Sequence, residues 1–263
     1  MEGGSKTIER VRTILAVLEK GPAEGMTSGQ IAAASGFDKA TAHRALISLE
    51  RIGLLDRDVE TRRYRLGVYL FSLGALVARR FSVLSQARDV IRKIAVETGD
   101  TVFLSVRNNF DSVCIDSATG GYPLKAQTLT IGESVPLGVS AGGVAMLATM
   151  PDEEVRHALQ FNAVAITAFR RVRPEEIYAH VEAARENGFA RYAGHVVAGM
   201  GAVAKAIRDH TGKGVAVISV TALIDRLSDH RSAWIAELIG EGIRSIEERS
   251  NILTSYGTAT DET

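Results

Sequence analysis

The sequence predicts an α+β protein in two parts, a small helical part followed by a larger part that mixes helices and strands. Three short helical patterns and an alternating hairpin fill residues 5–66. From Ser85 onward, strand-like alternation recurs between amphipathic helices. Charge divides the chain in the same way, because residues 1–80 hold 13 Lys and Arg against 9 Asp and Glu, whereas the remainder holds 18 against 22. A chain of 263 residues is long enough for two such domains.

Two helices that meet at a glycine turn are predicted over residues 27–52, TSGQIAAASGFDKATAHRALISLERI. Thr27 is placed to cap the first helix, and Gln30, three residues on, completes a capping box. Gly36 can take the left-handed conformation that ends this helix. Asp38 then caps the second helix.

The second helix has one face for the core and one for a partner. Its apolar stripe consists of Ala42, Ala45, Leu46 and Leu49. The opposite face, at about 100° per residue, carries Ala40, Arg44, Ile47, Ser48 and Arg51, with Lys39, Thr41 and His43 on its shoulders. This combination is typical of a DNA-binding helix-turn-helix. The alternative is an ordinary helical hairpin with a solvated face.

The segments on either side of this pair favour DNA binding. Residues 5–20 predict a first helix, because they place apolar side chains on one helical face: Ile8, Val11, Ile14, Leu15 and Leu18. Residues 54–66 predict a β-hairpin with Arg62 and Arg63 at its tip and Arg65 on its return strand. Three helices and a basic hairpin make a winged helix-turn-helix, in which the wing contacts backbone phosphates. The basic charge of this part agrees.

Residues 67–82, GVYLFSLGALVARRFS, predict a connecting helix. Its apolar side is formed by Tyr69, Leu73, Leu76 and Val77. This helix is too apolar for a solvated linker, so we expect it to pack on the first helix or on a partner subunit.

The remainder of the chain predicts a mostly antiparallel sheet with helices on its faces. The strands are expected at residues 101–107, 113–117, 124–129, 189–192, 200–207 and 215–220. The helices are expected from residue 85 to Gly99 and at 140–150, 152–160, 174–187 and 234–249. Residues 251–263 are expected to be a disordered tail.

Composition restricts the cellular context and the chemistry. Cys114 is the only cysteine, which excludes an intrachain disulfide and fits a reducing compartment. The polar N-terminus lacks a signal peptide, and the longest apolar run, near 215–224, is too short for a bilayer. We therefore expect a cytoplasmic protein without a membrane partner. The six histidines show no metal-ligand spacing, so no metal site and no cofactor are expected.

The sequence resembles the isocitrate-lyase-regulator (IclR) family of bacterial transcription factors over about residues 5–250. The resemblance is carried by Lys39-Ala40-Thr41-Ala42-His43-Arg44-Ala45-Leu46, Leu49-Glu50-Arg51-Ile52-Gly53, Tyr64-Arg65-Leu66-Gly67, Thr98-Gly99-Asp100-Thr101-Val102, Val135-Pro136-Leu137, Ser140-Ala141-Gly142-Gly143-Val144-Ala145 and Glu186-Asn187-Gly188-Phe189. It implies a winged helix-turn-helix over 5–66, a linker helix over 67–82 and a GAF-like effector-binding domain over 83–250. It also implies a regulator, expected to be a repressor, that binds a double-stranded operator as a dimer or a dimer of dimers.

The resemblance also implies roles for residues. The expected DNA contacts are Ser28, Lys39, Ala40, Thr41, His43, Arg44, Arg62 and Arg63. The expected effector contacts are Val135, Ser140, Ala141, Gly142, Tyr192, Met200, Ala202, Ser219 and Thr221. The residue types support part of this effector site, because the first-turn amides of a helix capped by Ser140 attract a carboxylate. Alternatively, the glycines there only permit close packing. The expected effector is a small organic molecule, a carboxylate or a phenol.

Two enzyme motifs also match the sequence. Gly138-Val139-Ser140-Ala141-Gly142 fits the G-x-S-x-G nucleophile elbow of hydrolases, and Asp225 and His230 follow in triad order. That fold needs a parallel sheet, whereas hairpin-like strands precede the motif. Gly199–Ala204 fits G-x-G-x-x-A, but too few residues follow for a dinucleotide-binding domain. No catalytic residue is therefore expected, and a small-molecule hydrolase is kept as the alternative.

Overall fold

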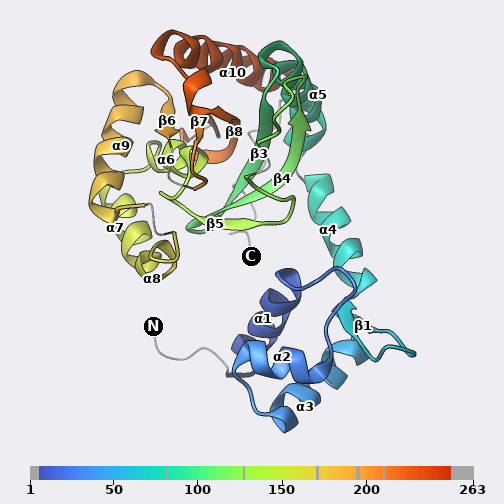
Figure 1. Cartoon of the computed structure of the whole chain (residues 1–263). Coiled ribbons are helices and arrows are strands. Elements are labelled where there is room, and N and C mark those ends of the chain that lie inside the picture. The colour runs from blue at the N-terminus through green and yellow to red at the C-terminus, as the bar shows by residue number, and fades with distance from the viewer. Residues whose placement is uncertain are drawn as a thin grey trace, which may run out of the picture. The chain divides into compact units, whose positions relative to one another are not determined.

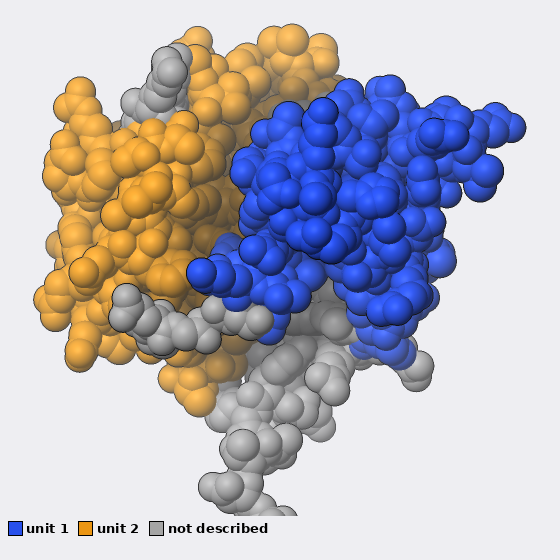
Figure 2. Space-filling model, turned by 90° about the horizontal axis from the view of Figure 1, so that it is seen from below, with its two compact units in different colours: residues 1–81 blue, residues 82–263 orange. Residues whose placement is uncertain are grey.

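The computed structural model describes residues 6–80, 82–126, 128–169, 172–193, 196–209 and 211–249. It divides the chain into two compact units, residues 1–81 and 82–263, which Figure 2 colours separately. The predicted tail, residues 251–263, lies outside the described residues. Among the described residues, no helix is long and apolar enough to cross a lipid bilayer.

Unit 1 begins with three helices and a two-stranded hairpin in the predicted order (Figure 1). The helices are α1 (Lys6–Glu19), α2 (Ser28–Ser35) and α3 (Lys39–Arg51), and the hairpin strands are β1 (Leu55–Arg57) and β2 (Tyr64–Leu66). The core of the unit consists of Ile14, Leu18, Ile31, Leu46, Leu49, Leu55 and Tyr64. Ile8, expected on the apolar face of the first helix, is 70% exposed, because the packed face of α1 begins only near Val11.

The predicted caps of the helix-turn-helix are confirmed. The Thr27 hydroxyl accepts from the Gln30 amide, and the Gln30 side chain accepts from the Thr27 amide, which completes the capping box. Gly36 ends α2 at φ +71°, a left-handed conformation in which a glycine carries no steric cost. The Asp38 carboxylate accepts from the Thr41 amide at 2.8 Å and caps α3.

The helix α4 (Val68–Arg80) follows the hairpin and carries an exposed apolar surface. Val68 is 69% exposed, Phe71 76% and Leu76 59%. Within the described part of the chain, these side chains are not covered by other residues. Of the two packing partners expected for this helix, the first helix does not cover these side chains, and packing on a partner subunit stays a prediction.

Unit 2 is built on one six-stranded antiparallel sheet with the strand order β5-β4-β3-β8-β7-β6. The strands are β3 (Thr101–Asn108), β4 (Asp111–Thr119), β5 (Ser134–Pro136), β6 (Ala190–Ala193), β7 (Met200–Arg208) and β8 (Gly214–Leu223). The sheet is curled, and helices lie on both of its faces (Figure 1). This α+β architecture is the predicted fold class.

Each face of the sheet has its own apolar core. Helices α5 (Ser82–Thr98) and α10 (Asp229–Arg249) pack on one face, against side chains such as Val102, Val203 and Ile218. Helices α6 (Ala141–Leu147), α7 (Asp152–Phe161) and α9 (Pro174–Asn187) form the second core with the other face. Alternate residues of β7 and β8 therefore point to different cores, as the period of a strand requires.

The motif from Thr98 to Val102 joins several elements of unit 2. The Asp100 side chain is 2% exposed and contacts Arg226 at 3.1 Å and Arg231 at 2.7 Å. Both arginines also donate to the carbonyl oxygen of Thr98. The end of α5, the start of β3 and the segment that leads into α10 are thus held at one buried carboxylate.

One predicted strand of unit 2 is wrong, and one short helix was not predicted. The strand expected at 124–129 is not formed by the described residues of that range, and Leu124 is 62% exposed. The strand that pairs with the edge of β4, at residues 111–113, is β5 (Ser134–Pro136). A short helix, α8 (Ala163–Ile166), was not predicted, because four residues are too few to show a helical period.

Candidate DNA-contacting face and effector cavity

Five of the eight predicted DNA contacts lie on α3. Lys39, Ala40, His43 and Arg44 are exposed and Thr41 is half-buried. The opposite stripe is anchored in the core of unit 1, where Ala42, Leu46 and Leu49 are buried. Arg44 Nη2 donates to Thr41 Oγ1 at 3.3 Å, which ties the two candidate contacts together. Hydrogen bonds from Thr41 lower the pKa of the Asp38 carboxyl, so the cap of this helix is ionised at neutral pH.

The N-terminal ends of α2 and α3 form a shallow hollow on the surface of unit 1. Its volume is about 310 Å³, and it is lined by Ser28, Gly29, Lys39, Ala40 and His43. Four of the eight predicted DNA contacts therefore lie at one place. Gly29 was not among the predicted residues; its position after the capping Thr27 could have indicated it, because first-turn amides are free to donate.

The arginines of the hairpin differ in exposure and in hydrogen bonding. Arg62 is exposed and adopts φ +55°, in the left-handed region that a non-glycine residue rarely enters. Arg63 is half-buried and donates from Nη1 to the carbonyl oxygen of Gly25 at 2.8 Å. Arg65 Nε donates to the carbonyl oxygen of Glu24 at 3.0 Å. Arg63 and Arg65 thus fasten the wing to the loop before α2, and Arg62 is left facing solvent.

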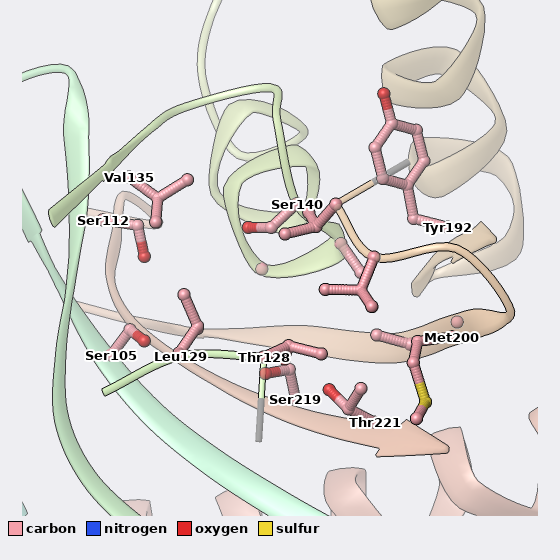
Figure 3. A pocket seen from close by; sticks show the side chains of 16 residues that line it. Ser105, Ser112, Thr128, Leu129, Val135, Ser140, Tyr192, Met200, Ser219 and Thr221 are labelled. Atoms are coloured by element: carbon pink, nitrogen blue, oxygen red, sulfur yellow. The ribbon is translucent and has the colours of Figure 1, made fainter. Parts of the chain in front are cut away.

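All nine predicted effector residues line one cavity of unit 2 (Figure 3). The cavity has a volume of about 50 Å³ and lies between the sheet, α6 and the segments around residues 128–135 and 196–201. Seven further residues line it and were not predicted: Ser105, Ser112, Thr128, Leu129, Val196, Val197 and Gly201. Ser105 and Ser112 could have been found from strand alternation, because polar residues on the buried face of a strand are unusual.

The glycines at the start of α6 are required for packing. A Cβ on Gly143 would lie 2.8 Å from the backbone nitrogen of Gly138, and one on Gly142 would lie 3.2 Å from Val217 Cγ1. The Ser140 hydroxyl accepts from the Gly143 amide at 3.1 Å and caps the helix as predicted. Both glycines therefore lie in close packing, and Gly142 also lines the cavity, so a contact of Gly142 with the effector stays a prediction.

Tyr192 closes one side of the cavity with its ring. Its ring centroid lies 4.5 Å from that of His180 on α9, at an interplanar angle of 90°. In Figure 3 the hydroxyl end of Tyr192 points away from Ser219 and Thr221. Burial raises the pKa of Tyr192 to about 12, so its phenol is neutral at physiological pH.

Cys114 is a buried structural residue and does not line the cavity. Its Sγ lies 3.7 Å from the carbonyl oxygen of Asp116. Burial raises the pKa of the Cys114 thiol to about 11, which keeps it protonated and unreactive at neutral pH. The described residues contain no group of three or more His, Cys, Asp or Glu placed to hold a metal ion.

The two enzyme motifs do not form the sites that they would require. Ser140 follows β5 in an antiparallel sheet, and neither Asp225 nor His230 lines the cavity beside it. The hydrolase elbow instead needs a parallel sheet and a base within hydrogen-bond reach. The segment from Met200 to Ala204 belongs to the strand β7, so it is not a phosphate-binding turn.

Comparison with known proteins identifies both halves of the chain. Residues 7–59 match the IclR helix-turn-helix domain, and residues 75–248 match the C-terminal domain of the bacterial transcriptional regulator IclR. The transcriptional regulator KipR of Bacillus subtilis is 24% identical over 250 residues, which are 95% of this chain and 98% of KipR. The transcriptional repressor AllR of Escherichia coli is 28% identical over 247 residues, which are 92% of this chain and 89% of AllR.

Solved structures show the same fold. An IclR-type regulator from Alicyclobacillus acidocaldarius superposes with a TM-score of 0.77 at 25% identity, over 94% of this chain and 99% of that one. An IclR homologue from Microbacterium hydrocarbonoxydans, solved in complex with 4-hydroxybenzoate, has a TM-score of 0.73 at 17% identity, over 93% and 100% of the two chains. The family models together cover most of the sequence, and the chain belongs to the IclR family of bacterial DNA-binding transcriptional regulators.

Proposed function

We propose that this regulator is a repressor that binds a pseudo-palindromic operator and releases it when a small organic effector enters the cavity of unit 2. The observation that carries the proposal is the anchoring of α3. One face is buried in the core of unit 1, and the opposite face presents Thr41, His43 and Arg44 to solvent. Such a helix fits the major groove of double-stranded DNA.

The proposed DNA contacts divide into two kinds. Arg44 is the candidate for a base edge, because it is exposed on the outer face of α3 and its guanidinium can bind guanine bidentately. Arg62 at the wing tip and the hollow lined by Ser28, Lys39 and His43 are candidates for backbone phosphates. Arg63 is a weaker candidate than the sequence suggested, since it already donates to Gly25.

The repressor is proposed to act as a homodimer or a dimer of dimers in the cytoplasm. A pseudo-palindromic operator needs two copies of α3, and the exposed apolar side chains of α4 supply a surface for a second copy. The signal from the cavity is proposed to pass along residues 67–82, which join the two units covalently.

We further propose that the protein performs no hydrolysis. The lining of the cavity offers Ser140 but neither of the triad partners that the motif predicts. Incubation with an activated ester should show equal turnover for the wild type and Ser140→Ala. A rate that falls with this substitution would restore the hydrolase alternative.

The test of DNA binding is fluorescence anisotropy with DNA from upstream of the protein's own gene, at two salt concentrations and with a scrambled competitor. We expect tight, salt-sensitive binding that the competitor does not displace. Arg44→Ala should cost about 1–3 kcal/mol on the specific site and little on the scrambled DNA. Arg12→Ala, an equally charged change on α1, is the matched control. Weak binding of equal strength to both DNAs would contradict the proposal.

A further inference from the structure

One wall of the cavity is built from hydroxyl groups on three neighbouring strands. Ser112 lies on β4, Ser105 on β3, and Ser219 and Thr221 on β8, in a sheet where β3 separates β4 from β8. The four residues are buried, with exposed fractions between 3% and 7%. They lie around the same space in Figure 3, together with the cap residue Ser140.

These four hydroxyls are not used by the protein itself. In the described part of the chain, none of them makes a hydrogen bond to a side chain or to the backbone. A buried hydroxyl without a partner costs about 1–3 kcal/mol, so such groups are normally satisfied by water or by a ligand. The cavity, at about 50 Å³, has room for more than one water molecule. Water molecules, or a ligand with several polar atoms, can therefore satisfy these hydroxyls.

The described lining of the cavity contains no charged side chain. Its remaining walls are apolar or aromatic, formed by residues such as Leu129, Val135 and Met200. The strand β7 also carries Lys205, but this side chain lies on the opposite face of the sheet. Its Nζ is beside Gly240 of α10, 3.2 Å from where a Cβ at that glycine would lie. Among the described lining residues, a carboxylate buried here would find no charged side chain to pair with, and an unpaired buried charge is far more costly than an unpaired hydroxyl.

We infer that the effector is a compact, uncharged molecule with hydroxyl groups, such as a phenol, a benzylic alcohol or a diol. This inference rests on the proposed effector function and decides between the carboxylate and the phenol that the sequence left open. Serine and threonine hydroxyls both donate and accept, as the hydroxyls of an alcohol do. The apolar walls then contact its carbon skeleton, and the first-turn amides of α6 can donate to a neutral oxygen.

The test compares uncharged compounds with acids of matched carbon skeleton: benzyl alcohol with benzoate, the phenol 4-hydroxybenzyl alcohol with 4-hydroxybenzoate, and propane-1,2-diol with lactate. Two quantities are measured on the full-length protein, the release of labelled operator DNA and the shift in melting temperature. In the pair that responds best, we expect half-maximal release at an about tenfold lower concentration of the uncharged member, equivalent to about 1.4 kcal/mol.

Variants connect this response to the hydroxyl wall. Ser219→Ala and Thr221→Val should each raise the effective concentration of the active alcohol about fivefold or more and leave DNA binding without effector unchanged. Ser134→Ala is the control, because its hydroxyl bonds Asp111 outside the cavity. An equal loss in all three variants would overturn the assignment of the wall.

Three further outcomes are decisive. Equal or stronger action of the acids would overturn the inference, and so would the absence of any response to the uncharged series. In both cases specific DNA binding, measured first in the same assay, would leave the proposed regulatory function intact. Loss of specific DNA binding itself would instead refute the proposed function.

Discussion

At the scale of single residues, the wing tip combines backbone strain with a candidate phosphate contact. Arg62 adopts φ +55°, a conformation that costs an L-residue about 1 kcal/mol and costs glycine nothing. Arg62→Gly should therefore keep or raise the melting temperature while lowering affinity for DNA of any sequence. The slope of log affinity against log salt should fall by about 1. Arg62→Asn, which tolerates the same backbone, is the control; unchanged DNA affinity in both variants would remove this residue from the interface.

A second residue-scale prediction concerns Thr101. Its side chain is buried on β3, 3% exposed, and its hydroxyl has no hydrogen-bond partner in the described structure. Thr101→Val should raise the free energy of unfolding by about 1 kcal/mol, because the cost of the unpaired hydroxyl disappears. Thr98→Val, at a buried hydroxyl that donates to the Ile94 carbonyl, should lower stability instead. Urea denaturation of both variants measures the sign, and a loss in Thr101→Val would reveal a partner for that hydroxyl.

At the scale of elements, the buried Asp100 carboxylate holds α5, β3 and α10 together. Asp100→Asn removes the negative charge that two arginines share and should lower the free energy of unfolding of unit 2 by about 3 kcal/mol. Asp89→Asn, at an exposed pair with Arg92 on α5, is the control and should change little. Equal denaturation midpoints for the two variants would show that the buried cluster does not stabilise the fold.

At the scale of the whole molecule, α4 is the element whose packing is incomplete. In the proposed homo-oligomer, Phe71→Glu should abolish self-association through this helix, because a charge would enter the proposed apolar interface. Sedimentation velocity should then detect the monomer, and affinity for a two-half-site operator should fall while binding to a half-site persists. Val96→Glu, at an equally exposed position on α5, should leave the oligomer intact. An unchanged oligomer in Phe71→Glu would place the contact between copies elsewhere.

Much of unit 1 follows from local sequence. Thr27 with Gln30, Gly36 and Asp38 fix where two helices begin and end, because caps and left-handed turns depend on residues within one turn of chain. The alternation of apolar and polar residues after Leu54 likewise predicts the β-hairpin of the wing. The sequence did not show that Arg63 and Arg65 donate hydrogen bonds to the loop before α2, because their carbonyl partners are 38 and 41 residues away in sequence.

The sequence by itself determined the fold class, the helix-turn-helix with its wing, and the family to which the chain belongs. Those conclusions depend on periodicity, caps and short motifs, which are local properties. Only the tertiary structure decided that Ser105 and Ser112 join Ser219 and Thr221 on one wall, and that Thr128 and Leu129 line the cavity instead of forming a strand. Strand order and register determine both outcomes. They bring together residues more than a hundred positions apart in sequence, and local sequence patterns carry no information about such pairings.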